Sequence, residues 1–324
     1  VRFAGQLGFA IEEKTREAIV ERADHLKNIS AERIRVELTK LLVSKEAGRI
    51  RDAYKTGMTK YFLPELDAAM QTEQKNPHHI YTVGEHSICG IELMNCFFGI
   101  TSDEKIYDKI PENVLETAKK LAAKMDKKQQ TVLCMTMLLH DIAKPAVMTV
   151  DEKGIGHFIG HPAQSEKMAK KIMRRLTFDN DSISKACRLI RFHDYRMEDK
   201  SRAFRRAVSK IGADIMDMLF LVEYADVLAQ SDMQRDEKLA KIDAGVKRFE
   251  YIMANAQPLS IKDLAVTGSD LIAAGVKPGP KMGEILKAML DKVLDEPELN
   301  TKDGLLNYLK CENGNKNVEE NEDL

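Results

Sequence analysis

The stretch LLHDIAKP, at residues 138–145, ends an apolar run with an imidazole, a carboxylate and an amine. His140 and Asp141 follow Leu133 at helical spacing, so both side chains project from the stripe that a helix would bury. Lys144 follows about one helical turn after Asp141. A buried carboxylate and imidazole are costly without partners, so this pattern predicts polar or metal-bound neighbours elsewhere in the chain.

Further histidine and aspartate residues lie at or beside apolar helical positions. His161 opens a predicted helix after a glycine-rich loop, and His193 ends the apolar stripe of a helix predicted at about 182–194. Asp226 lies on the apolar face of a helix predicted at about 213–231. Imidazole and carboxylate ligands suit Mn, Fe, Co, Ni, Zn or Mg, so a site for one or two divalent ions is one economical explanation. The candidate ligands are His86, His140, Asp141, His161, His193 and Asp226.

Each candidate also has a purely structural explanation. A single core histidine such as His193 is more often hydrogen-bonded to the backbone than bound to a metal, and a buried aspartate such as Asp226 usually pairs with arginine or caps a helix. Lys144 can equally be a solvated cation at a helix end, where the helix dipole favours it. The remaining histidines lie in predicted loops or on a solvated helix and are not predicted to be ligands: His25, His78, His79 and His157.

The spacing of apolar residues predicts helices nearly throughout, so the expected fold is all-α and multi-helical. Ser30 can cap a helix whose Ile34, Leu38 and Leu41 fall on one face. No stretch shows a convincing strand alternation, and the glycines of 151–162 predict a loop there.

Composition limits the class of protein. Lys and Arg total 50 against 51 Asp and Glu, so any nucleic-acid surface must be a local patch. No signal peptide and no membrane-spanning run are apparent, which predicts a cytoplasmic protein with no membrane partner. The first residue is not Met, which suggests a fragment of a longer chain. The scattered cysteines are expected to be reduced: Cys89, Cys96, Cys134, Cys187 and Cys311.

The order of the candidate ligands resembles the HD phosphohydrolase superfamily, which has a histidine, a His-Asp doublet and a distal aspartate. Members that hold two metals add two histidines between the doublet and the last aspartate. In this chain the matching residues are His86, His140 with Asp141, Asp226, and then His161 and His193.

This resemblance implies metal-dependent hydrolysis of a phosphoester, because a bound divalent metal lowers the pKa of water and polarises a phosphoryl oxygen. It implies that Asp141 bridges two metals. It also implies that Lys144, which fills a position common in the superfamily, holds a phosphate or the nucleophilic water.

The chain also resembles, over nearly its whole length, the bacterial tRNA nucleotidyltransferase (CCA-adding enzyme) and poly(A) polymerase family. This resemblance rests on Glu32, Arg33 and Glu37 near the N-terminus. It also rests on the segment LSIKDLAVTGSDLIAAGVKPGPKMGEILKAMLDKVLDEPELN. The implied organisation is a helical neck at 1–63, an HD domain at 64–254, and a helical tail at 255–324 with a disordered acidic end.

The family's β-rich transferase head, with its Gly-Ser sequence and Asp-x-Asp metal pair, is missing from this sequence. The one Asp-x-Asp, at Asp179 and Asp181, lies in a turn and is predicted to cap a helix. The chain alone is therefore not expected to add nucleotides, and a head would have to be supplied in cis or in trans.

A basic stretch at 166–210 holds fourteen Lys or Arg against six Asp or Glu, a net of +8. Such a stretch is usually a solvated face, but beside a phosphohydrolase site it would guide RNA or nucleotide phosphates. The candidate phosphate-binding residues are Arg205, Arg206, Lys277 and Lys281.

Two hypotheses follow. The first is a metal-dependent phosphohydrolase that acts on nucleotide or RNA-end phosphoesters, including 2′,3′-cyclic phosphates and 2′-nucleotides by the family resemblance. The second is an RNA-binding body, with tRNA as partner, whose metal site is vestigial or structural.

Overall fold

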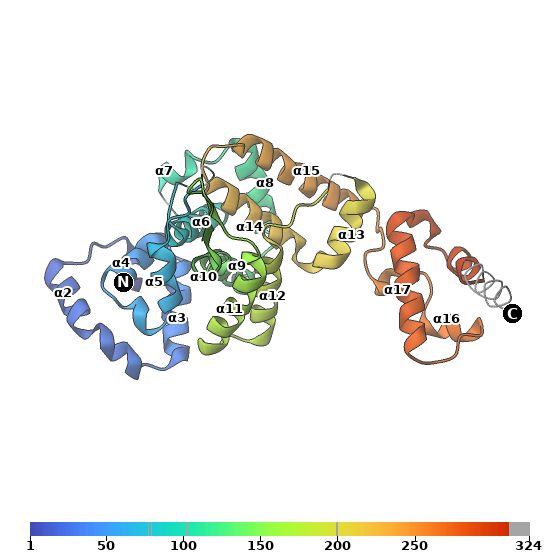
Figure 1. The fold of residues 1–324 in the computed structure, drawn as a ribbon, viewed down its shortest axis with the longest axis horizontal. Coiled ribbons are helices and arrows are strands. Elements are labelled where there is room, and N and C mark those ends of the chain that lie inside the picture. The colour runs from blue at the N-terminus through green and yellow to red at the C-terminus, as the bar shows by residue number, and fades with distance from the viewer. Residues whose placement is uncertain (77, 79, 102, 199, 311–324) are drawn as a thin grey trace. The chain divides into compact units, whose positions relative to one another are not determined.

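The computed structural model describes residues 1–76, 78, 80–101, 103–198 and 200–310 (Figure 1). The predicted disordered C-terminus, together with His79 and Cys311, lies outside the described residues. The chain forms two compact units. The first comprises residues 1–195 and 217–243, and the second comprises 196–216 and the chain from 244 onward. The domain bounds 1–63, 64–254 and 255–324 remain a prediction, and residues 64–254 include parts of both units.

The fold is all-α, as predicted, with two short strands among the described residues. The first unit begins with a set of short helices. The Ser30 side chain accepts a hydrogen bond from Arg33 N at 3.4 Å, so it caps the following helix as predicted. These elements are α1 (Arg2–Leu7), α2 (Glu13–Arg22), η1 (Ala23–Asn28), α3 (Ala31–Leu42), η2 (Ala47–Arg49), α4 (Ile50–Lys55), η3 (Thr59–Tyr61) and α5 (Pro64–Gln71).

The core of the first unit is built around α9, which packs against α6 and α12, while α11 packs on α12. Thr82 caps α6 by accepting from Glu85 N at 3.3 Å, and Asp126 forms a capping box with Gln129 at the start of α9. The helices are α6 (Val83–Phe97), α7 (Glu104–Tyr107), α8 (Glu112–Ala122), α9 (Lys127–Leu139), α10 (Lys144–Val147), α11 (His161–Arg175), α12 (Asn180–Phe192) and α14 (Met216–Leu228).

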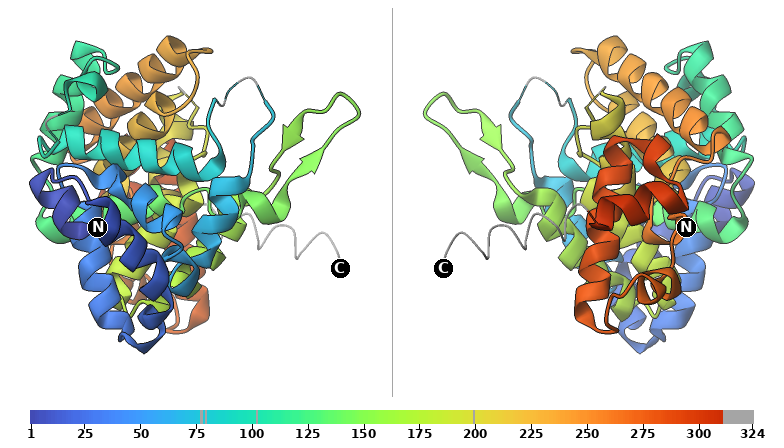
Figure 2. Two further views of the ribbon diagram at one scale, coloured as in Figure 1. Left: turned by 90° about the vertical axis from the view of Figure 1, so that its left-hand side faces the viewer. Right: turned by 90° about the vertical axis from the view of Figure 1, so that its right-hand side faces the viewer.

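A hairpin interrupts the helices between α10 and α11. Strands β1 (Thr149–Val150) and β2 (Gly156–His157) pair antiparallel, whereas the sequence predicted only a loop from residue 151. Strands of two residues are too short for alternation to be visible in the sequence. Figure 2 shows this hairpin projecting beside the segment that joins α5 to α6, and Gly156 N donates to Lys75 O at 3.0 Å.

The second unit contains helices whose apolar faces pack on one another, with α13 against α17. Its elements are α13 (Ser201–Ile211), η4 (Ala213–Ile215), the C-terminal part of α15 (Arg235–Ala254), η5 (Ile261–Asp263), α16 (Gly268–Ala273), α17 (Pro280–Asp295), η6 (Pro297–Leu299) and a helical segment at 302–310.

Two further expectations can be compared with the described residues. Each helix there is too short or too polar to cross a lipid bilayer. Four cysteines are free thiols, as predicted: Cys89, Cys96, Cys134 and Cys187.

Candidate metal centre

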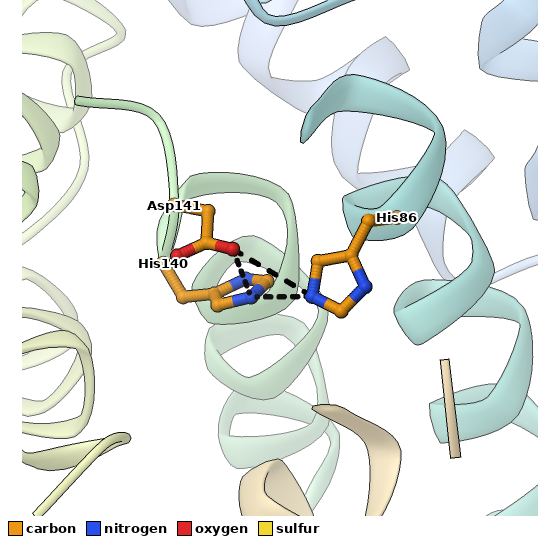
Figure 3. Close-up of side chains that lie close together, drawn as sticks. All are labelled: His86, His140 and Asp141. Atoms are coloured by element: carbon orange, nitrogen blue, oxygen red, sulfur yellow. Dashed lines mark hydrogen bonds and ion pairs between the residues drawn. The ribbon is translucent and has the colours of Figure 1, made fainter. Parts of the chain in front are cut away.

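The first group of predicted ligands meets where α6 faces the C-terminal end of α9 (Figure 3). His86 lies in the first turns of α6, His140 is the C-terminal cap of α9, and Asp141 follows it. His86 Nε2 lies 3.2 Å from His140 Nε2 and 3.6 Å from Asp141 Oδ2. Both histidines are fully buried and Asp141 is 1% exposed, so ordinary solvent does not satisfy these groups.

A second group uses the other oxygen of the same carboxylate. Asp141 Oδ1 lies 3.2 Å from His161 Nε2 and 3.6 Å from His193 Nε2. His161 is the first residue of α11, and His193 is the C-terminal cap of α12. The donor atoms in each group lie within 4.8 Å of one another, as ligands of one metal ion must. Asp141 therefore lies between two groups of side chains, and each group offers three ligand atoms to a cation.

Asp226 joins the first group from α14. Its Oδ1 lies 2.8 Å from His86 Nε2 and 3.5 Å from His140 Nε2. Its other oxygen, Oδ2, accepts a hydrogen bond from Gln230 Nε2 at 3.0 Å. All six predicted ligands thus converge in the first unit, although they come from five helices or helix ends.

The four histidines share one arrangement that fixes their tautomers. In each, Nδ1 lies 2.8 to 3.3 Å from a backbone carbonyl oxygen, which can only accept a proton. Nδ1 must therefore be the donor, and in the neutral ring Nε2 carries a lone pair. The carbonyls belong to Ala229 for His86, Met137 for His140, Phe158 for His161 and Ile190 for His193.

Converging lone pairs require a proton or a metal ion between them. The Nε2 atoms of His161 and His193 are 3.4 Å apart, close to the 3.2 Å of the other histidine pair, and a neutral ring offers no proton between them. Buried Asp141 Oδ1 has no hydrogen-bond donor among the described residues. This donor set of imidazole nitrogens and carboxylate oxygens fits a divalent ion.

The electrostatics also favour a positive charge. Burial alone would raise the pKa of Asp141, but the charges of His140 and Lys144 hold that pKa well below its usual value. Burial would lower the pKa of His140, but the charge of Asp141 and its hydrogen bonds to Asp141 and Asp226 raise it to about 10. The two carboxylates therefore create a negative field that either a proton or a metal ion must balance.

Lys144 is buried beside the carboxylate. Its Nζ lies 2.7 Å from Asp141 Oδ2 and 2.8 Å from Gln74 Oε1, and it stands 5.3 Å from the centre of the Phe158 ring. Only 5% of the residue is exposed. The alternative of a solvated cation at a helix end is therefore wrong.

The histidines that were not predicted to be ligands stay outside both groups where the structure describes them. His157 is exposed and lies 2.9 Å from Asp151, and His25 is exposed beside Asp24. The His78 carbonyl accepts from Ser231 N at 2.9 Å.

The Asp-x-Asp sequence behaves as predicted. Asp179 Oδ1 accepts from Ser182 N at 3.1 Å and so caps α12. Lys128 on α9 lies 2.9 Å from both Asp179 and Asp181. These carboxylates hold two helices together.

The predicted phosphate-binding residues belong to the second unit and differ among themselves. Arg205 is 8% exposed and donates through Nε to Leu294 O at 2.7 Å, so it contradicts the prediction of a solvated surface. Arg206 pairs with Asp295, also at 2.7 Å. Arg205 faces inward because α13 is amphipathic and buries that side against the end of α17. Lys277 and Lys281 are exposed on either side of the start of α17.

Two glutamines near the site were not predicted. Gln74 contacts Lys144, and Gln230 links Asp226 to Lys238, whose Nζ lies 2.7 Å from Gln230 Oε1. Glutamine in a loop or at a helix end carries no pattern of its own. The bond from Gln74 spans 70 residues of sequence, and only the folded chain shows it.

Comparison with known proteins gives the family. A family model described as the probable RNA and SrmB-binding site of polymerase A matches residues 8–70. A second, described as tRNA nucleotidyltransferase domain 2, putative, matches residues 149–309. The chain therefore belongs to the tRNA nucleotidyltransferase and poly(A) polymerase family.

Two individual relatives are similar over most of this chain. The CC-adding tRNA nucleotidyltransferase of Thermus thermophilus is 28% identical over 301 residues, which covers 90% of this chain and 60% of that protein. The bifunctional uridylyltransferase/uridylyl-removing enzyme of Bradyrhizobium sp. is 26% identical over 222 residues, covering 66% of this chain and 21% of that enzyme.

A solved structure has a similar fold. It is the Bacillus stearothermophilus CCA-adding enzyme in complex with CTP, with a TM-score of 0.51 and 17% identity, covering 98% of this chain and 61% of that one. The chain spans about three fifths of the length of the Thermus relative and of this structure.

Proposed function

We propose that the chain is a metal-dependent phosphohydrolase of the HD type, acting on nucleotide or RNA-end phosphoesters. The observation that supports it most strongly is the convergence of four histidine Nε2 atoms on the buried carboxylate of Asp141 and the half-buried carboxylate of Asp226, with every Nδ1 turned to a backbone carbonyl. Such an arrangement turns four Nε2 atoms and two carboxylates toward one another, which favours cation binding over a packed core.

The residues have distinct roles in this proposal. His86, His140, Asp141 and Asp226 would hold one ion, and Asp141, His161 and His193 would hold a second. A divalent ion bound there supplies a Lewis acid for a phosphoryl oxygen and lowers the pKa of water. Lys144 keeps its ammonium beside Asp141 Oδ2, where it can donate a hydrogen bond to a phosphate oxygen.

The relatives support the class of substrate. One bears the name of a tRNA nucleotidyltransferase and another that of a uridylyl-removing enzyme. Removing a uridylyl group cleaves a phosphoester, which is the reaction class proposed here. The first name points to RNA ends and nucleotides as substrates, and the second to cleavage of a nucleotidyl phosphoester.

The test is the substitution Asp141→Ala in the full chain. Loss of an outer partner of a metal ligand typically costs about 10- to 100-fold, so removing a ligand shared by both groups should cost at least about 100-fold in phosphodiester hydrolysis. Metal content should fall with it. Metal per chain is measured by mass spectrometry, and hydrolysis is measured on bis(p-nitrophenyl) phosphate with each candidate divalent ion.

His157→Ala is the matched control, because it removes an exposed histidine outside both groups. It should leave metal content and rate unchanged. Hydrolysis retained by Asp141→Ala with full metal content would contradict the assignment.

The second candidate is an RNA-binding body with a structural metal site. It is favoured by the match of residues 8–70 to a family model described as a probable RNA-binding site. A metal-loaded chain that binds tRNA but hydrolyses no phosphoester would support this reading over the first.

A further inference from the structure

Gln74 is a buried polar residue with a defined role in the site's geometry. It lies in the segment between α5 and α6 and is 2% exposed. Its Oε1 accepts from Lys144 Nζ at 2.8 Å, and its Nε2 donates to Tyr81 O at 3.4 Å. A buried amide with both ends bonded is held in one orientation, and it therefore fixes what it contacts.

Gln74 limits the freedom of the Lys144 ammonium. A lysine has three N–H donors on a flexible stem. Asp141 Oδ2 accepts one at 2.7 Å and Gln74 Oε1 accepts another. Two acceptors from different segments fix the position of Nζ and leave one further N–H for a substrate oxygen.

The hairpin is docked on the same segment. A Cβ on Gly156 would lie 2.5 Å from the Gln74 carbonyl oxygen, a backbone atom that cannot move aside. Gly156 N also donates to Lys75 O at 3.0 Å (Figure 2). The backbone of Gln74 therefore supports β2 while its side chain holds Lys144.

We propose that Gln74 is a positioning residue that orients Lys144 for a phosphate oxygen of the substrate. This inference rests on the proposed phosphohydrolase function. Gln74 acts through Lys144 and does not touch the reacting atoms. The alternative is that Gln74 only fills space beneath the hairpin, in which case its effect would be independent of Lys144.

The first arm of the test measures hydrolysis. Gln74→Leu keeps the volume but removes the acceptor, and Gln74→Glu keeps an acceptor oxygen. Gln74→Leu removes a hydrogen bond to a charged group. It should therefore lower kcat/KM for bis(p-nitrophenyl) phosphate about tenfold at unchanged metal content. Gln74→Glu should recover most of this loss, and the exposed control Gln71→Leu should match the wild type.

A double-mutant cycle separates positioning from packing. In a Lys144→Met background, Gln74→Leu should cause no further loss, because the partner through which it acts is gone. Losses that multiply in the double variant, or a Gln74→Glu chain as impaired as Gln74→Leu, would overturn the proposal.

The second arm does not depend on hydrolysis. Acetic anhydride labels lysine amines, and peptide mass spectrometry reports labelling of Lys144 against exposed Lys120. Gln74→Leu should raise the labelling rate of Lys144 on the order of tenfold, because a bond that holds its ammonium is lost. Equal labelling in wild type and variant would overturn the positioning role. A wild type without hydrolytic activity would instead refute the proposed function. The labelling rates would still test whether Gln74 holds the Lys144 ammonium in place.

Discussion

At the residue scale, the two carboxylate oxygens of Asp141 contact different groups of side chains. Oδ1 faces His161 and His193, while Oδ2 faces His86, His140 and the ammonium of Lys144. One carboxylate can serve two groups only because its backbone follows directly on the helix end that places His140. The helix end therefore positions His140 and Asp141 together.

Single-ligand variants should separate the two groups. His161→Ala removes a ligand of one group and should lower the metal content by up to one ion per chain, while His86→Ala should affect the other group. Asp141→Ala should lower both. Metal per chain, measured after dialysis, reports this directly.

Metal removal gives the companion measurement. A chelator should lower the melting temperature of the wild type, since a ligand that binds only the folded chain stabilises it. His157→Ala should show the same chelator shift as the wild type. An identical melting temperature with and without chelator would argue against a bound ion.

At the element scale, the site depends on how closely α5 approaches α6. A Cβ on Gly84 would lie 2.7 Å from Met70 N and 2.8 Å from Met70 Cα, so the two backbones are nearly in contact just before His86. A side chain there must push the helices apart.

Gly84→Ala should therefore lower the free energy of unfolding by about 2 kcal/mol. Gly90→Ala on the same helix is the matched control. Its Cβ would meet Met137 Cε, the end of a flexible side chain that can rotate away. Urea unfolding of both variants tests the difference, and equal losses would mean that the close approach of α5 is not the cause.

The start of α12 offers a second test at this scale. Asp179→Ala removes the helix cap and one ion pair to Lys128, and should cost about 1 kcal/mol. Asp181→Ala removes exposed ion pairs to Lys128 and Lys185 but no helix cap, and should cost less.

The pH dependence follows from the carboxylate of Asp179. Its hydrogen bond from Lys128 holds its pKa below the usual value. The stabilisation is therefore present above pH about 4, the unfolded pKa, and is lost as the pH falls. The gap in unfolding free energy between wild type and Asp179→Ala should close in acid.

At the scale of the whole molecule, RNA binding is expected to be electrostatic. Lys277→Glu with Lys281→Glu should weaken binding to tRNA and flatten its dependence on salt, because fewer counterions are released. Hydrolysis of a small phosphodiester should be unchanged. Lys119→Glu with Lys120→Glu, a charge reversal on α8, is the control, and an equal loss of affinity there would remove the predicted site.

Sequence patterns predicted the helices and their caps because these depend on interactions between residues close together in the chain. Helical periodicity identified the all-α fold, and the caps at Ser30 and Asp179 were correct because capping depends on residues three positions apart. The six candidate ligands were found because imidazoles and carboxylates on apolar stripes are costly without partners.

What the sequence by itself determined was therefore the class of fold and the identity of the candidate ligands. Only the tertiary structure decided that Arg205 is buried, that Lys144 is held by Gln74, and that each histidine turns Nδ1 to a carbonyl. These outcomes depend on contacts between segments far apart in the chain, such as the 70 residues between Gln74 and Lys144. A periodic pattern tells which face of a helix is buried, but the packed neighbours determine which atoms meet there.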